Sequence, residues 1–113
     1  MLAKKSRLSR NKDFDLVFKE GTSVYGQFLG VKIKKNEKTF NRFGVLVGTK
    51  VSKLAVVRNL YKRRIKSIVF QEEKLLTKGY DCVIVVSKEI KSKSFENIQE
   101  EIKKIFTKLK FYK

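Results

Sequence analysis

Residues 54–86, LAVVRNLYKRRIKSIVFQEEKLLTKGYDCVIVV, decide the fold, because within them a helical pattern of apolar residues gives way to a strand. From about Leu54 to Leu76 the apolar residues recur at about 3.6 residues per turn, which makes one side of a helix apolar. They include Val57, Leu60, Tyr61, Ile65, Ile68 and Val69. Gly79 ends this region, and the unbroken apolar run 82–86 is typical of a strand buried on both faces. We therefore predict a long helix that leads into an interior strand.

Two further strands are predicted before this helix. Residues 27–34 alternate apolar side chains with glycine and lysine, which is the period of a half-buried strand. Residues 40–48 repeat the alternation and close on Gly48. Because only a polar turn at 34–38 separates the two segments, we expect them to pair as a hairpin.

A helix is predicted at each end of the chain. Asn11 can cap the first, over residues 12–20, and Gly21 ends it. Ser92 or Ser94 can cap the last, whose apolar stripe comprises Phe95, Ile98, Ile102, Ile105, Phe106 and Leu109. The order α-β-β-α-β-α, which leaves room for an extra short strand, predicts an α+β fold in the form of a two-layer α/β sandwich. Because proline, repeats and a linker are absent, we expect residues 1–113 to form one domain, of which 1–10 are a basic arm.

The composition of the chain favours some classes of function and excludes others. The chain has 28 Lys plus Arg against 11 Asp plus Glu, a net charge of +17, and this favours a polyanionic partner. Nucleic acid is the first candidate and an anionic membrane surface the second. With no His and a single Cys, the usual metal ligands and a disulfide framework are missing, which fits a reducing cytoplasm. No segment resembles a signal peptide or a membrane span.

Positive charge is concentrated in the middle of the chain. Residues 32–66 hold twelve Lys or Arg and a single acid, Glu37. On the long helix Arg58, Lys62 and Lys66 form one row at i, i+4, i+8, with Asn59 and Arg63 beside it. Since like charges at this spacing destabilise an isolated helix, the rows suggest a phosphate partner, the alternative being a solvated face. Charge alone does not distinguish duplex DNA from structured RNA.

The first helix carries aromatic residues on one side. Phe14 and Phe18 lie one turn apart, Leu16 is on the other side, and Tyr25 follows in the next loop. One interpretation is that both phenylalanines belong to the core. The other is that they line a groove in which unstacked bases of a single strand stack on aromatic rings.

The segment Ala55–Lys66 resembles the R-N-R-x-K-R signature helix of the bacterial ribonuclease P protein subunit. The opening helix, and the strand and loop before the signature helix, are also similar to those of that family. The residues that carry this similarity are Leu8, Asp13, Phe14, Val17, Phe18, Lys19, Gly21, Gly44, Val47, Lys50, Val51 and Ser52. The resemblance implies a protein cofactor of a catalytic RNA that removes the 5′ leader of precursor tRNA. It also implies a left-handed crossover around the signature helix, an exception to the usual rule.

The resemblance assigns two sets of contacts. The catalytic RNA would contact Lys50, Lys53, Arg58, Asn59, Lys62, Arg63, Arg64 and Lys66. A cleft for the single-stranded leader would be lined by Phe14, Phe18, Tyr25 and Val31. This chain departs from the family at Leu60, where the second arginine is expected, and at Val31, where an aromatic is often found. We hypothesise that Arg64, one turn after Leu60, replaces the missing charge.

The implied partners are the catalytic RNA and precursor tRNA, with no DNA and no membrane. The implied activity is that of an endoribonuclease ribonucleoprotein in which RNA performs the chemistry, so we expect no catalytic residue in this chain and Mg²⁺ held mainly by RNA. A nuclease acting alone would need converging carboxylates, and the sequence shows only adjacent acidic pairs on helix surfaces. The alternative function is that of a ribosomal protein or general RNA chaperone without leader specificity.

Overall fold

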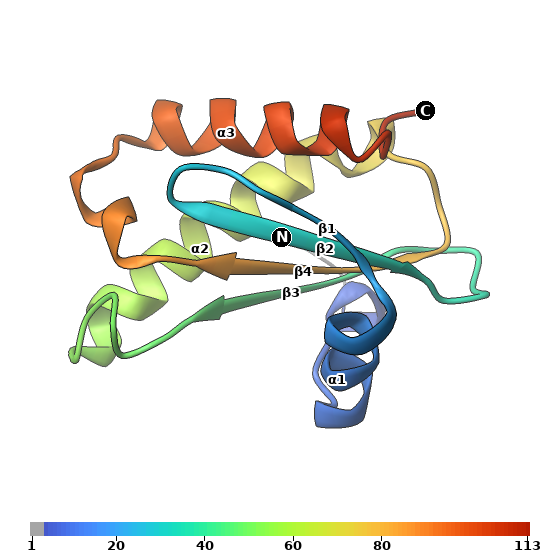
Figure 1. Cartoon of the computed structure of the whole chain (residues 1–113), viewed down its shortest axis with the longest axis horizontal. Coiled ribbons are helices and arrows are strands. Elements are labelled where there is room, and N and C mark those ends of the chain that lie inside the picture. The colour runs from blue at the N-terminus through green and yellow to red at the C-terminus, as the bar shows by residue number, and fades with distance from the viewer. Residues whose placement is uncertain (1–3) are drawn as a thin grey trace.

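The computed structural model describes residues 4–113 and contains four strands and three α-helices (Figure 1). The elements in chain order are η1 (Lys4–Ser6), α1 (Asn11–Glu20), β1 (Thr22–Tyr25), β2 (Leu29–Lys35), β3 (Arg42–Val47), α2 (Ala55–Glu72), η2 (Glu73–Leu75), β4 (Tyr80–Val86), η3 (Lys88–Ser92) and α3 (Phe95–Lys108). The predicted α+β class is confirmed, and β1 is the extra short strand for which the predicted order left room.

The four strands form one sheet in the order β1-β2-β4-β3. The predicted hairpin between β2 and β3 is therefore wrong, because β4 lies between them, antiparallel to β2 and parallel to β3. β4 takes the interior place because its unbroken apolar run is buried on both faces, as its sequence predicts. The hairpin of this fold is formed instead by β1 and β2, and Tyr25 lies in a strand rather than in the predicted loop.

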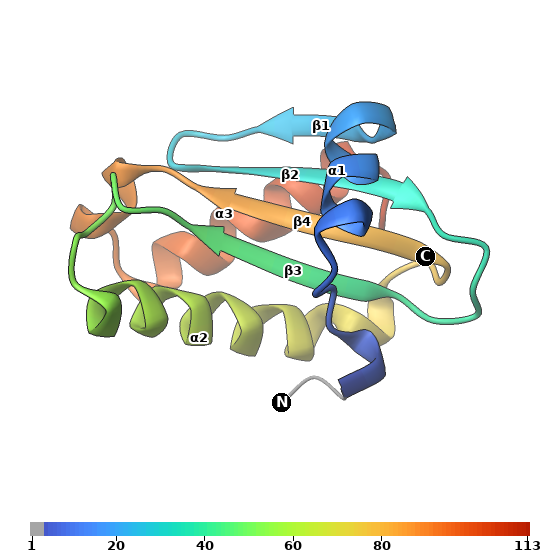
Figure 2. The same cartoon turned by 90° about the horizontal axis from the view of Figure 1, so that it is seen from below.

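The connection from β3 through α2 to β4 joins neighbouring parallel strands. Figure 2 views the sheet from the α1 side, with α3 behind it, and shows β3 and β4 pointing the same way. The crossover is left-handed, as the family resemblance implies, and departs from the usual right-handed rule. α2 and α3 thus cover one face of the sheet, and α1 crosses the other.

The main core lies between the sheet and the α2–α3 layer. It contains inward residues of β2, β3 and β4, including Val31, Val45 and Ile84, together with Ile65 of α2 and Phe106 of α3. Cross-strand register places Val31 opposite Ile84, and Ile84 opposite Val45, so these three share this face. The face covered by α2 and α3 therefore supplies most of the apolar burial that stabilises the fold.

A smaller apolar cluster holds α1 on the other face. Val17 and Leu8 pack on Val83 of β4, with Phe14 half-buried beside them. The Leu8 backbone N–H donates to the Phe43 carbonyl at 2.8 Å, so residues 7–8 run alongside β3. In the described part of the predicted basic arm, 4–10, Ser6 and Leu8 are buried and the basic residues are exposed. Residues 1–3 of the arm lie outside the described residues.

The helix ends differ in how well the sequence predicted them. Ser94 caps α3 as one of the two predicted candidates, and its hydroxyl accepts from the Asn97 N–H at 3.1 Å in a capping box. Asn11 does not cap α1, since it is the first helical residue and Arg10 precedes it without a side-chain cap. Phe95, the first residue of α3, is exposed and does not belong to the buried stripe that was predicted to include it.

Candidate nucleic-acid interface

α2 presents the predicted basic residues on its outer surface. Asn59 and Arg63 are exposed, while Arg58, Lys62 and Lys66 are half-buried along their stems. Tyr61 and Ile65 pack in the core and hold α2 in one rotational setting. The row of Asn59 and Arg63 therefore faces away from the sheet, and the row of Arg58, Lys62 and Lys66 runs beside the buried side of α2.

The loop before α2 extends this surface. Lys50 and Lys53 are exposed in it, and Val51 is buried in the core. Nη1 of Arg58 donates to the Ser52 carbonyl at 2.9 Å and so ties the loop to the helix. An arginine has five N–H donors, so this bond leaves others for a phosphate.

Arg64 contacts an aromatic ring rather than standing free. Its guanidinium lies 5.7 Å from the centre of the Tyr61 ring, one turn earlier on α2. Leu60, which occupies the place of the family arginine, is half-buried. The contact holds the guanidinium beside Tyr61 on the other flank of α2 from Lys62. Whether Arg64 replaces the missing arginine stays a prediction.

α1 divides the second face of the sheet into two halves. It crosses the strands, and Figure 2 shows it running over the sheet from β3 towards β1. Three cross-strand rows of side chains point to this face: Gly30–Val85–Leu46, Lys32–Val83–Gly44 and Lys34–Asp81–Arg42. The middle row lies beneath α1, because Val17 packs on Val83. One outer row is apolar and the other is charged.

We call the apolar side the aromatic half and define it by Phe18, Tyr25, Lys32, Leu46 and Val85. Phe18 is 39% exposed and Tyr25 is 65% exposed, so both rings present surface to solvent. Nζ of Lys32 lies 5.5 Å from the Phe18 ring centre and 5.7 Å from that of Tyr25. A cation between two exposed rings provides stacking surfaces together with a charge for a phosphate.

Two glycines allow the aromatic side chains to lie flat on the sheet. A Cβ at Gly30 would come within 2.4 Å of the Tyr25 ring, and one at Gly44 within 2.5 Å of the Phe14 ring. Phe14 is therefore packed over β3 and is mainly a core contact, whereas Phe18 is available to a ligand. The two alternatives left open by the sequence thus apply to different residues.

The prediction that groups Val31 with Phe14, Phe18 and Tyr25 is wrong. Val31 is 0% exposed and packs in the core beneath α2 and α3, on the other face of the sheet. Lys32 takes the position on the aromatic half that was assigned to Val31. The alternation in 27–34 contains this information, since Lys32 and Val31 must point to opposite faces, but the sequence does not say which face α1 covers.

The charged row is a closed network. Arg42 donates to Asp81 at 2.8 and 2.6 Å and to Asp13 of α1 at 3.3 Å. The pKa of Arg42 is raised, chiefly by the hydrogen bond to Asp81, with smaller contributions from the charges of both carboxylates against partial burial. Asn36 adds a donor to Asp81 at 2.9 Å. The network joins α1 to the sheet and fixes the angle at which α1 crosses it.

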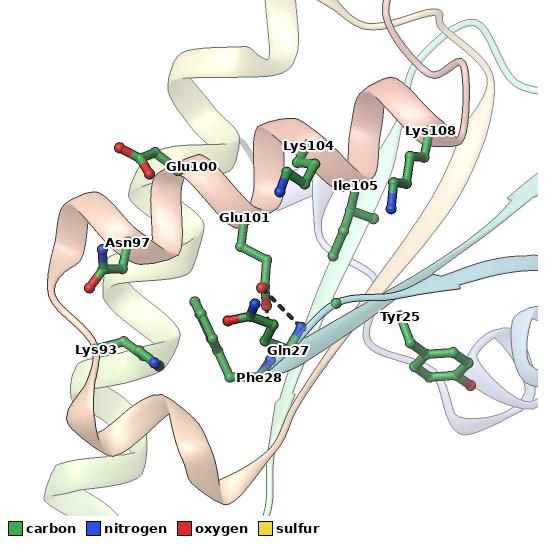
Figure 3. A pocket seen from close by; sticks show the side chains of 11 residues that line it. Tyr25, Gln27, Phe28, Lys93, Asn97, Glu100, Glu101, Lys104, Ile105 and Lys108 are labelled. Carbon is green, nitrogen blue, oxygen red and sulfur yellow. Dashed lines mark hydrogen bonds between the residues drawn. The ribbon is translucent and has the colours of Figure 1, made fainter.

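A separate pocket of about 440 Å³ lies between α3 and the β1–β2 turn (Figure 3). Its lysines are Lys93, Lys104 and Lys108, but its central carboxylate, Glu101, is bound to the turn. Glu101 accepts from the backbone N–H groups of three successive residues, Gln27–Leu29, at 2.9–3.1 Å. We therefore assign this pocket a structural role in holding the turn that follows Tyr25.

The acidic residues do not assemble a metal site. Among residues 4–113, no three His, Cys, Asp or Glu side chains are placed to hold one ion. Asp13 and Asp81 share Arg42, and the thiol of Cys82 is buried, which raises its pKa. No helix in the described part of the chain is long and apolar enough to cross a membrane.

An α+β domain with a left-handed crossover, a basic helix on one surface and exposed aromatics on another defines a class of single-domain, RNA-associated proteins. The sequence model of the family described as Ribonuclease P matches residues 2–110. The chain belongs to the ribonuclease P protein family. Membership implies a part in the 5′ processing of tRNA as a subunit of a ribonucleoprotein, and it argues against the ribosomal or chaperone alternative.

Individual relatives agree along nearly the whole chain. The ribonuclease P protein component of Bacillus velezensis is 38% identical over 113 residues, covering 99% of this chain and 96% of the relative. That of a Pseudanabaena species is 34% identical over 111 residues, covering 97% and 96%.

Solved structures show the same fold. The RNase P protein of Staphylococcus aureus superposes with a TM-score of 0.88 at 25% identity, over 96% of this chain and 98% of that chain. The RNase P protein of Thermotoga maritima superposes with a TM-score of 0.79 at 29% identity, over 87% and 92%.

Proposed function

We propose that this chain binds the catalytic RNA of ribonuclease P through α2 and binds the single-stranded 5′ leader of precursor tRNA on the aromatic half. The RNA performs the cleavage, and the protein supplies binding and orientation in the cytoplasm. The observation that supports this assignment most directly is the separation of two chemically different surfaces, one a row of cations and the other exposed rings around Lys32.

The α2 surface suits structured RNA because its cations are numerous and unpaired. Among residues 4–113 the ion pairs shorter than 4.0 Å involve only Lys34 and Arg42 as cations. Phosphates would therefore supply the first close counter-charge for the rows on α2, and binding would release counterions. If 6 to 10 phosphates are contacted, affinity falls about 10³- to 10⁵-fold between 50 and 200 mM salt.

The aromatic half suits an unpaired strand. Each exposed ring offers a stacking surface of a kind that every base can use, and Lys32 lies where it can meet a backbone phosphate between two stacked bases. Mature tRNA lacks the leader and cannot make these contacts. The difference in affinity between precursor and product gives selectivity for the substrate.

A cationic protein that contacts both RNAs also reduces their mutual repulsion. Two polyanions approach more readily when a shared protein neutralises phosphates on each, so less Mg²⁺ is required to assemble them. The described residues provide no cluster of donors suited to Mg²⁺. We propose that RNA holds the Mg²⁺ at the reaction centre, and no step is assigned to a metal bound by this chain.

The decisive test is cleavage of a precursor tRNA with a 5′ leader by a bacterial ribonuclease P RNA at low Mg²⁺. We expect cleavage with RNA and protein together, little with RNA alone and none with protein alone. Cleavage by the protein alone would contradict RNA-based catalysis, and no effect of the protein would contradict the proposed function.

Variants then separate the two surfaces. Because stacking contributes about 1–3 kcal/mol per base, Phe18→Ala or Tyr25→Ala should reduce the preference for precursor over mature tRNA by roughly 5- to 150-fold. Phe70→Ala, which removes an exposed ring from α2, is the matched control and should leave that preference unchanged. Lys62→Gln with Lys66→Gln should instead weaken binding of the catalytic RNA and lower the salt slope by about 2.

A further inference from the structure

We propose that the charged half of the α1-bearing face is a third RNA contact, which binds the sugar–phosphate backbone through Arg10, Lys12, Lys34, Lys35 and Lys38. We call this set the basic half. It lies across α1 from the aromatic half and on a different element from the α2 rows. The inference rests on the proposed RNA-binding function and adds to it a site with phosphodiester groups as its ligand class.

The basic half surrounds a defined hollow. A pocket of about 750 Å³ is lined by these five cations together with Asp13, Leu16, Asn36, Glu37, Arg42 and Asp81. Leu16 lines this pocket because residues two apart on a helix point to different sides. Phe18 points towards Lys32, and Leu16 points to the other side of α1. The second apolar side of α1 thus forms a wall of this pocket.

The charges of the pocket divide into a neutralised floor and a cationic rim. In the floor Arg42 is bound to Asp81 and Asp13, so none of these three groups is free to meet a ligand. On the rim Lys34 lies 3.8 Å from Glu20, and the other four cations have no carboxylate within 4.0 Å among residues 4–113. The rim therefore offers unpaired positive charge above a floor whose carboxylates are already bound.

The loop that carries part of the rim is held in place. Nδ2 of Asn36 donates to Asp81 at 2.9 Å and to the Phe40 carbonyl at 3.2 Å, and its Oδ1 accepts from the Lys38 N–H at 2.8 Å. The Asn36 N–H donates to the Gly79 carbonyl at 2.9 Å, which links this loop to the start of β4. Lys35 and Lys38 are thus presented from a fixed backbone, which reduces the entropy lost on binding.

Glu37 is the one lining carboxylate outside this network. It has a backbone φ of 61°, in the left-handed region, and it makes no ion pair within 4.0 Å in the described part of the chain. Among the lysines and the neutralised floor, Glu37 is a single negative charge that opposes a phosphate. Its removal should therefore strengthen binding at this site.

The test compares two triple variants with the same net charge. Lys12→Gln/Lys35→Gln/Lys38→Gln alters the basic half, and Lys91→Gln/Lys103→Gln/Lys104→Gln alters η3 and α3. Dissociation constants are measured against salt concentration for a bacterial ribonuclease P RNA, a precursor tRNA with a leader, and the mature tRNA.

We expect the basic-half variant to bind roughly 10- to 100-fold more weakly at 150 mM salt and to lower the salt slope by about 2 to 3, since each lysine–phosphate contact contributes about 1. The control variant should change affinity by less than about threefold. Weakening confined to the precursor identifies the leader as the source of the phosphates, and weakening confined to the catalytic RNA identifies that molecule.

Glu37→Gln provides a test in the opposite direction. It should tighten binding of the same RNA by about two- to fivefold, whereas Glu100→Gln, an exposed carboxylate on α3, should not. If the two triple variants bind all three RNAs equally, and Glu37→Gln changes nothing, the basic half is solvated surface and the inference is wrong. If wild-type protein binds none of the RNAs, the proposed function itself fails.

Discussion

Replacing Glu101 tests how the turn after Tyr25 is held. The Glu101 carboxylate on α3 accepts from the N–H groups of Gln27, Phe28 and Leu29 at 2.9, 3.0 and 3.1 Å. Dashed lines in Figure 3 mark hydrogen bonds of Glu101 to this turn. The carboxylate can approach this closely because residue 26 is glycine; a Cβ at this position would lie 2.6 Å from the Glu101 carboxyl carbon. Glu101→Ala removes the acceptor of these three N–H groups at once.

The expected loss of stability follows from those bonds. A hydrogen bond to a charged group contributes about 1.5–3 kcal/mol when its surroundings exclude water, and less when they do not. The bonds to Phe28 and Leu29 are partly buried, while that to Gln27 is exposed to solvent. We therefore expect Glu101→Ala to lower the free energy of unfolding by about 2–4 kcal/mol. Glu101→Gln keeps one neutral acceptor and should cost about 1–2 kcal/mol.

Urea denaturation followed by circular dichroism measures this loss. The midpoint should fall without a change in the m-value, since the surface exposed on unfolding is almost the same. Glu100→Gln is the matched control, because Glu100 is exposed and adjacent to Glu101 on α3. If Glu101→Ala and Glu100→Gln shift the midpoint equally, the carboxylate does not hold the turn and the reasoning is refuted.

Two other predictions concern packing and ionisation. Gly44→Val should lower the free energy of unfolding by about 1–3 kcal/mol, because the valine side chain would displace the Phe14 ring. Gly48→Ala is the control and should change the free energy of unfolding little, because a Cβ at Gly48 would have no heavy atom within 4 Å; urea denaturation compares the two variants. Burial, and to a smaller extent the hydrogen bond to Glu72, raises the pKa of Tyr112 above its usual 10.0. The free energy of unfolding of the wild type should therefore fall as the pH rises above about 10. Tyr112→Phe has no phenol to ionise and should lack this part of the loss when denaturation is measured against pH. Equal pH profiles for the two proteins would contradict this.

Much of the architecture was predictable from local pattern. The helical spacing from Leu54 onward, the apolar run 82–86 and the capping serine of α3 each depend on residues close in sequence, and α2, β4 and the Ser94 cap are confirmed. The basic rows on α2 follow from the same spacing, because the core side of a helix determines its outer side.

Strand pairing was not predictable in this way. The short turn at 34–38 favours a hairpin between its flanking strands, yet β4 lies between them because its apolar side chains need neighbours on both faces and both edges. That competition involves segments some fifty residues apart, for instance Ile33 beside Cys82. The pairing of the strands is therefore decided by how the layers pack, and a short segment of sequence does not contain this information.

What the sequence by itself determined is the class of the three α-helices and of β2, β3 and β4, the identity of the interior strand β4 and the basic residues of α2. Periodicity and charge are properties of neighbouring residues, so a local segment contains them. Only the tertiary structure decided which face of the sheet α1 covers. Val31 thereby lies on the face that α2 and α3 bury, and Lys32 lies on the α1-bearing face near the Phe18 and Tyr25 rings. The physical reason is that alternation along a strand assigns side chains to two faces but does not say which face is the core until distant segments pack on it.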